Sequence, residues 1–270
     1  MSLPGIRFRP VASEGRHTRA VKLADTPIVS FDIFDTLVVR ACAEPADVFE
    51  HVERRAVCEG LAAEDFAKAR SAAEKRAREL KSGEVTLGDI YAQLEGRFSA
   101  GDLERLRALE CDCEVSLCVR NLPGKRLYDK ALAAGSRVVY TSDMYLPSEI
   151  VRAILSSCGY TAELPLFLSC EAGRTKASGE LFDFVAKSLG VARRDILHIG
   201  DNPRSDVLRP RMRGLRAKRL RGTSGGSRQE KAGLADAAAA VLATQHDGSD
   251  FLRDELGYSS LGPLLAGFCR

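Results

Sequence analysis

The stretch VSFDIFDTLVVR, residues 29–40, decides how the rest of the chain is interpreted. Its first half belongs to the apolar run PIVSFDIF, residues 27–34, which is typical of a central parallel strand. Two aspartates, Asp32 and Asp35, stand at the end of this run. Because burying a carboxylate is costly unless it has a partner, we expect each aspartate to have a partner at this strand end.

The composition is that of a globular protein with a sizeable core. The chain has 270 residues, of which 45% are apolar and 29% charged, and its net charge of +3 gives no general polyanion-binding signal. No apolar run approaches the ~20 residues of a membrane span, and the first residues lack the apolar centre of a signal peptide. The eight cysteines are too sparse for a disulfide scaffold. We therefore expect a cytoplasmic protein with reduced thiols, no membrane span and no nucleic-acid partner.

Strand and helix patterns alternate along the second half of the chain. We expect strands at 136–143, 164–169, 194–201 and 215–220, and helices at 122–134, 147–159, 178–190 and 202–213. This alternation predicts an α/β fold, a doubly wound parallel sheet with helices on both faces.

A long helical block separates the first strand from the others. Residues 44–119 carry helical spacing and good helix formers, and we expect no strand among them. The predicted domains are a core of residues 1–40 and 121–222, an inserted all-helical cap of 41–120, and a helical extension of 223–270. The segment GTSGGS, 222–227, is a flexible break, and the apolar ending LGPLLAGFCR favours either a further C-terminal domain in the natural chain or an end packed on the core.

Polar residues gather where the expected strands end. In doubly wound folds, ligands bind outside the carboxyl ends of the strands. The polar residues at or after these ends are Asp32, Asp35, Ser142, Asp143, Lys176, Asp201 and Asp206. Carboxylates packed this closely need a cation to stay ionised together, and hard oxygen ligands favour Mg²⁺.

Four of these segments resemble the motifs of the haloacid dehalogenase (HAD) superfamily, most of whose members are phosphatases. The segments are FDIFDTL, VVYTSD, Lys176 and HIGDNPRSD, and their order and strand contexts agree with the family. The resemblance covers residues 28–40 and about 121–220, and the block at 41–120 lies where the superfamily inserts a helical cap. It implies a Rossmann-like core and a small phosphorylated substrate.

The resemblance also implies roles for individual residues. Asp32 would be the nucleophile that forms an aspartyl phosphate, Ser142 would hydrogen-bond the transferring phosphoryl group, and Lys176 would neutralise its charge. Mg²⁺ would be held by Asp32, Asp201 and the backbone carbonyl of Phe34. The residues expected to support these groups are Asp206, Asp35 and Asn202. The residues expected to contact substrate are Asp143, Arg174 and Arg40.

One position departs from the family pattern. The usual phosphatase motif has a second aspartate two residues after the nucleophile, where it serves as general acid and base, and here that place is Phe34. Asp35 falls one position later, where the family usually has glycine, and a one-residue shift turns a strand side chain to the other face. We expect Asp35 to turn away from the site and to accept backbone N–H groups of the following turn, while Phe34 walls the space of the missing acid.

Three functions stay open on the sequence. The first is a Mg²⁺-dependent phosphatase or phosphotransferase, and the second is a metal-independent hydrolase acting at carbon, against which Asp201 and Asp206 speak. The third is a catalytically weak domain that binds a phosphorylated ligand or a partner. Relatives with the FDIFDTL variant tend to accompany bacterial glycosyltransferases, so the resemblance implies partners in that pathway.

Other features have simpler interpretations. His198 lies inside an apolar strand and is expected to be a satisfied core residue rather than a base. The basic run at 209–222 is expected to be a solvated surface. Cys111, Cys113 and Cys118 are expected on one helix as buried thiols, without a metal.

Overall fold

The computed structural model describes residues 26–42 and 44–220 of the chain. The sequence before residue 26, the predicted break at 222–227 and the predicted extension of 223–270 lie outside the described residues. Among the described helices, none combines the length and the apolar character that crossing a membrane requires.

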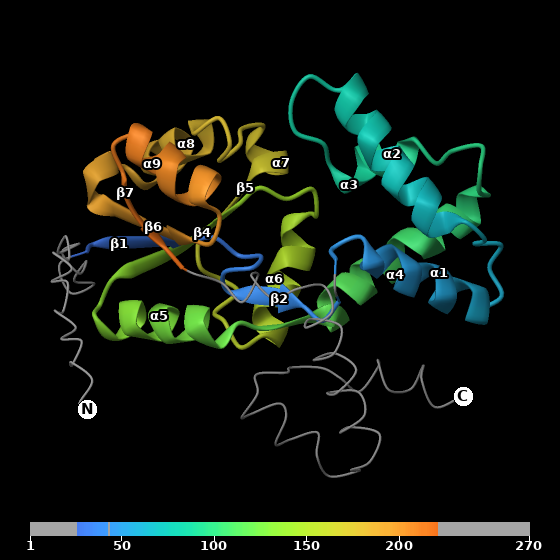
Figure 1. Ribbon diagram of the computed structural model, residues 1–270, viewed down its shortest axis with the longest axis horizontal. Coiled ribbons are helices and arrows are strands. Elements are labelled where there is room, and N and C mark those ends of the chain that lie inside the picture. The colour runs from blue at the N-terminus through green and yellow to red at the C-terminus, as the bar shows by residue number, and fades with distance from the viewer. Residues whose placement is uncertain (1–25, 43, 221–270) are drawn as a thin grey trace, which may run out of the picture.

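A parallel sheet forms the core of the fold, as the alternating pattern predicted. Its five strands lie in the order β5-β4-β1-β6-β7, and every neighbouring pair is parallel (Figure 1). The strands are β1 (Ile28–Phe31), β4 (Arg137–Ser142), β5 (Leu166–Leu168), β6 (Ile196–Gly200) and β7 (Arg216–Arg219). The chain moves from β1 towards β5 and then returns to β6, so β1 and β6 flank the point where the winding reverses. This is the ligand-binding position in doubly wound sheets.

Helices cover both faces of this sheet (Figure 1). The helices are α5 (Leu122–Ala133), α6 (Ser148–Ser157), α7 (Ser169–Ala172), α8 (Glu180–Leu189) and α9 (Arg209–Met212). A 3-10 helix, η2 (Arg193–Asp195), precedes β6, and a π-helix, η3 (Pro203–Leu208), precedes α9. The helix expected at 202–213 is therefore a π-helix followed by a short α-helix.

The central strand β1 shows why the sheet needs two layers of helices. Val29 and Phe31 belong to one apolar cluster, which includes residues of α5 and α6, while Ile28 belongs to another that includes residues of α8. Successive side chains of a strand point to opposite faces, so a strand covered on both faces is apolar throughout. By the same alternation, Ser30 and Asp32 share the face of Ile28, on the α8 side.

A second unit, made of four helices, lies beside the sheet (Figure 1). The helices are α1 (Asp47–Cys58), α2 (Phe66–Leu80), α3 (Leu87–Ala92) and α4 (Ala100–Leu117). They lie between β2 (Val38–Arg40) and β3 (Cys118–Arg120), which pair antiparallel. The prediction of a block without strands is wrong at its end, because the chain returning to the core pairs with the chain leaving it. Cys118 is therefore in a strand and not on the helix of Cys111 and Cys113.

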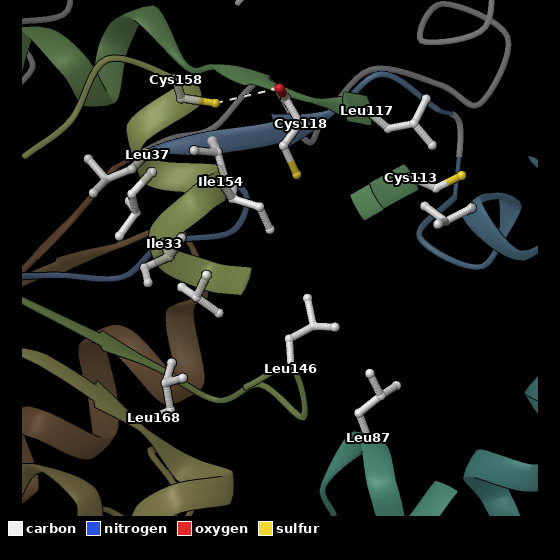
Figure 2. Packing of buried hydrophobic residues seen from close by; sticks show 14 of the residues in the cluster. Ile33, Leu37, Leu87, Cys113, Leu117, Cys118, Leu146, Ile154, Cys158 and Leu168 are labelled. Carbon is white, nitrogen blue, oxygen red and sulfur yellow. Dashed lines mark hydrogen bonds between the residues drawn. The ribbon is translucent and has the colours of Figure 1, made fainter. Parts of the chain in front are cut away.

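One continuous apolar cluster joins the two units. Leu87 of α3 and Leu146, which follows β4, both belong to it and lie near each other in Figure 2. The backbone N–H of Leu87 donates to the carbonyl of Tyr145 at 2.9 Å, and the Ser169 hydroxyl donates to Glu84 at 2.7 Å. These contacts fix the helical unit against the loops that follow β4 and β5.

Candidate active site

The carboxyl ends of the central strands surround a cavity of about 490 Å³. Asp32 follows β1, Ser142 ends β4 and Asp201 follows β6, as expected for residues meeting at one edge of a parallel sheet. The predicted site residues that line the cavity are Asp32, Phe34, Ser142, Asp143, Lys176, Asp201, Asn202 and Asp206.

Lys176 lies at the centre of the site. Its ammonium donates to Asp32 Oδ1 and, at 2.7 Å, to Asp206 Oδ1, and the side chain is buried. Its backbone N–H donates to Asp143 Oδ1 at 2.7 Å, and the N–H of Ala177 donates to the other oxygen of Asp143 at 3.3 Å. Asp143 therefore anchors the loop that carries Lys176. The sequence analysis expected Asp143 to contact substrate, and the structure shows its carboxylate bound to this loop.

The electrostatics of the site show a shortage of positive charge around Asp32. Burial raises the pKa of Asp32 to about 7, the neighbouring Lys176 opposes this shift, and Asp206 and Asp201 add to it. Burial by itself would lower the pKa of the Lys176 ammonium, but Asp32, Asp206 and Asp143 outweigh it and raise that pKa. The lysine therefore stays charged, while a further cation would be needed to hold Asp32 fully ionised near neutral pH.

Asp206 is the most completely partnered carboxylate of the site. Its Oδ1 accepts from Lys176 and from the imidazole Nε2 of His198 at 3.2 Å, and its Oδ2 accepts from the backbone N–H of Asn202 at 3.0 Å. Burial raises the pKa of this carboxyl, but Lys176 and His198 outweigh it, so the pKa is lowered. Asn202 also accepts the N–H groups of Arg204 and Ser205 on its side-chain oxygen and so begins η3.

Thr36 is a site residue that the sequence reasoning missed. Its hydroxyl donates to Asp32 Oδ2 at 2.9 Å and lies 3.4 Å from Asp201 Oδ1. It belongs to the turn after β1, and its place in the FDIFDTL segment was the signal that could have pointed to it. Asp32 thus has one oxygen on Lys176 and the other on a hydroxyl.

Three carboxylates lie close enough to share a cation. One oxygen from each of Asp32, Asp201 and Asp206 lies within 4.8 Å of the others. Because Asp206 is already taken by three donors, Asp32 and Asp201 are the better candidates to bind an ion. Burial, Asp206 and Asp35 all raise the pKa of Asp201, as expected for a carboxylate that lacks a neutralising charge.

Asp35 contributes through its backbone. Its φ is 58°, in the left-handed region that favours glycine and tolerates aspartate, and its N–H donates to the carbonyl of Val38 at 2.8 Å. The expected acceptance of backbone N–H groups by its carboxylate is not found in the part of the chain that the structure describes. An aspartate suits this position because it tolerates the left-handed backbone, and its carboxylate charge is not the reason.

The two arginines expected at the substrate do not line the cavity. The Nε of Arg40 lies 2.9 Å from Glu114 of α4, and its guanidinium lies 4.4 Å from the centre of the Phe34 ring. Arg174 is exposed, with its guanidinium 5.2 Å from the Phe184 ring. A carboxylate in the helical unit and an aromatic face in α8 attract these cations instead. Their contact with substrate stays a prediction.

The arginines at the cavity are Arg204 of η3 and Arg209 of α9. The sequence interpretation treated the run beginning at Arg209 as a solvated surface, and the structure adds that Arg209 is half-buried and lines the cavity. Within residues 26–42 and 44–220, neither guanidinium forms an ion pair. A signal for them was available, since both follow Asp201 by eight residues or fewer.

Gly200 gives a test of how tightly Asp206 is held. A Cβ at this position would lie 2.4–2.6 Å from atoms of the Asp206 side chain, which is buried and cannot move freely. Gly200→Ala should displace Asp206, and with it Lys176, and lower turnover about 10²-fold, since misplacements near 1 Å cost that much. Gly101→Ala is the matched control, because a Cβ there meets no atom within 4 Å. Unchanged turnover in Gly200→Ala would show that the placement of Asp206 is unimportant.

No protein-family model matches the sequence, and no curated protein matches it. Among solved structures, the chain is similar to a dehalogenase in an intermediate complex, with 13% identity, 75% of this chain and 88% of that chain covered, and a TM-score of 0.47. It is similar to a predicted phosphoglycolate phosphatase from Haemophilus somnus, with 12% identity, 79% and 98% covered, and a TM-score of 0.48. It is also similar to YfnB from Bacillus subtilis, described as a HAD-hydrolase bound to magnesium, with 17% identity, 72% and 88% covered, and a TM-score of 0.49. The solved structures named here are thus described as a dehalogenase, a phosphatase and a HAD-hydrolase.

Proposed function

We propose that this protein is a Mg²⁺-dependent phosphoryl hydrolase or phosphotransferase that acts on a small phosphorylated metabolite through an aspartyl phosphate on Asp32. The observation that carries this proposal is the environment of Asp32. It is a buried carboxylate at the switch point of the sheet, with Lys176 on one oxygen, Thr36 on the other and Ser142 and Asp201 at the same cavity.

The chain's own residues account for the two half-reactions. A carboxylate oxygen of Asp32 attacks phosphorus, and the bond to the leaving oxygen breaks with its electron pair. Water, or an acceptor hydroxyl, then attacks the same phosphorus and gives up its proton to solvent. The bond from phosphorus to Asp32 breaks with its electron pair and so restores the carboxylate. Lys176 neutralises the charge of the transferring phosphoryl group, and the Ser142 hydroxyl donates to one of its oxygens. Phe34 cannot protonate the leaving group, so the proton has to come from water or from the substrate.

The residues present fit a magnesium ion. Asp32, Asp201 and the carbonyl of Phe34 would hold it, and all three offer the hard oxygens that this ion prefers. The raised pKa of Asp32 is the second sign of fit, because it marks a buried carboxylate in need of a cation. When bound, the ion would offset the repulsion between an anionic nucleophile and an anionic phosphate.

Arg204 and Arg209 define the substrates to try first. The cavity of about 490 Å³ is larger than a phosphoryl group needs, and these two side chains extend the site along η3 and α9. Phosphate esters that carry a second anionic group, such as a carboxylate or another phosphate, complement them. The helical unit, which is fixed against the loop after β4, is proposed to serve as a cap beside the bound substrate.

The decisive test of the proposed function is a phosphatase screen on a broad metabolite panel, with and without Mg²⁺. Hydrolysis that depends on Mg²⁺ and stops with EDTA supports it. Turnover of a phosphate ester that survives EDTA would remove the metal from the proposal. Turnover of a haloacid without metal would favour the hydrolase acting at carbon.

A second candidate is a catalytically weak domain that binds a phosphorylated ligand, and Phe34 is the observation that favours it. Phe34 stands where a general acid would act, and loss of such a group costs about 10²–10⁴ in rate. Calorimetric binding of a panel phosphate in the absence of any turnover would select this candidate.

Magnesium alone should stabilise the protein. A ligand that binds only the folded state at 100 times its Kd adds about 2.7 kcal/mol, so we expect a rise of several degrees in Tm. Asp201→Asn should abolish this rise, whereas Glu163→Gln, which removes an exposed carboxylate elsewhere, should keep it. Differential scanning fluorimetry across a Mg²⁺ series measures both. An equal rise in the Asp201→Asn variant would contradict the assignment of Asp201 as a ligand.

A further inference from the structure

A row of polar side chains crosses the interior of the sheet, where apolar residues are expected. Ser30 of β1 is in register with His198 of β6, and Thr141 belongs to β4 on the other side of β1. All three side chains are completely buried. Burying hydroxyl and imidazole groups is costly unless every one is hydrogen-bonded. The presence of these three polar side chains inside the sheet therefore has to be explained.

The hydrogen bonds of this row have a defined direction. His198 Nε2 lies 3.2 Å from Asp206 Oδ1, and its Nδ1 lies 2.9 Å from the Ser30 hydroxyl, which lies 2.9 Å from that of Thr141. Burial lowers the pKa of His198 even though Asp206 opposes this, so the ring is neutral and carries one proton. A carboxylate can only accept, so that proton belongs on Nε2. Nδ1 then accepts from Ser30, which in turn accepts from Thr141.

The row ends at the reacting groups. Asp206 Oδ1 accepts from both His198 and Lys176, and Lys176 donates onward to Asp32. His198 itself does not line the cavity, both of its nitrogens are occupied, and the Phe182 ring packs edge-on against it at 4.8 Å between centroids. It cannot act as a base towards substrate, but it can fix the carboxylate that places the lysine.

We infer that His198 is a positioning residue for phosphoryl transfer, an inference that rests on the proposed function. Its Nε2–H holds Asp206, and Asp206 sets where the Lys176 ammonium meets Asp32 and the phosphoryl group. The sequence interpretation of His198 as a satisfied core residue is right about its hydrogen bonding and omits this consequence. Asp206 sets this tautomer, and Ser30 and Thr141 keep the other nitrogen, Nδ1, hydrogen-bonded.

The test compares variants that keep or remove the donor. His198→Leu removes it, whereas His198→Gln retains an amide N–H of similar reach. With p-nitrophenyl phosphate and Mg²⁺, we expect His198→Leu to lower kcat about 10- to 100-fold with little change in KM, because the lysine acts chiefly on the charge of the transition state. His198→Gln should recover most of the lost kcat. Phe182→Leu is the packing control, since it loosens the same place without touching a donor.

A purely structural role predicts a different result. His198→Leu and Phe182→Leu would then lower Tm alike, and kcat per folded molecule would stay at the wild-type value in both. That outcome, or a failure of His198→Gln to exceed His198→Leu, would overturn the inference.

Nuclear magnetic resonance separates this inference from the proposed function. In the ¹⁵N spectrum of the wild type, His198 should carry its proton on Nε2, and a proton on Nδ1 would overturn the inference whatever the activity. If the wild type hydrolyses no phosphate ester, the proposed function fails, and the Lys176 Nζ resonance then decides. Its displacement in His198→Leu but not in His198→Gln supports positioning by His198, and an unmoved resonance in both contradicts it.

Discussion

Asp32→Asn should abolish turnover, with a loss of about 10⁴-fold or more, while the fold stays intact. The amide has the shape of the carboxylate but cannot attack phosphorus, so no covalent intermediate can form. Acid-quenched samples with radiolabelled substrate should show a phosphoprotein for the wild type and none for the variant.

Burial raises the pKa of Asp32 from its ordinary 3.8 to about 7, so ionising this carboxyl costs the folded state stability, and the cost grows as pH rises between these values and is fully present above about 7. The neutral amide should therefore leave Tm unchanged or raise it, and a loss of activity by unfolding is not expected.

Asp35→Asn is the matched control, three residues away with the same change of chemistry. Asp35 does not line the cavity, and asparagine also tolerates the left-handed backbone that this position needs. We expect near wild-type turnover and at most a small change in Tm. Activity retained in Asp32→Asn, or lost equally in both variants, would remove Asp32 from its role and with it the proposed function.

The sheet could be predicted from sequence because its signals are local. Four of the five strands contain a short apolar run, and β4, β5 and β6 are each followed by a helix, so the alternation alone gives the fold class. The segment 27–34 shows the limit of this reasoning. The strand ends at Phe31, and four residues later Asp35 takes a left-handed conformation that turns the chain towards the helical unit. An apolar pattern carries no information about such a turn.

The groups that sequence reasoning missed depend on contacts between distant parts of the chain. Arg40 was expected at the substrate, but the residue that attracts it, Glu114, lies 74 positions later. His198 was read from its own strand, whereas its importance comes from Ser30 on one side and Asp206 on the other. The carboxyl ends of the strands converge in any parallel sheet, so the sequence alone predicts that the carboxylates at these ends lie close together. Which of them pair with which donors is decided by packing.

Phe34 is the position where this site departs most from one with its own general acid. The ring is half-buried, lines the cavity and has the guanidinium of Arg40 over its face. Arg40 is itself held by Glu114 through two hydrogen bonds, of 2.9 Å and 3.2 Å. The helical unit thus supports the back of the ring, and in the proposed reaction the ring would lie next to the leaving group.

Phe34→Asp should therefore restore acid catalysis, and the gain should depend on the leaving group. For alkyl phosphates, whose leaving oxygens need a proton, we expect a rate increase towards the 10²–10⁴-fold that a positioned acid typically contributes. For aryl and acyl phosphates, which leave without help, the rate should change little. Phe34→Leu is the control, because it opens the same space without adding a proton donor.

The measurement is log kcat/KM against leaving-group pKa for the wild type and both variants. The dependence should flatten in Phe34→Asp alone, since a general acid lowers the charge that develops on the leaving oxygen. A parallel shift of all substrates, or the same flattening in Phe34→Leu, would mean that Phe34 acts by its bulk, and that the proton reaches the leaving group by another path.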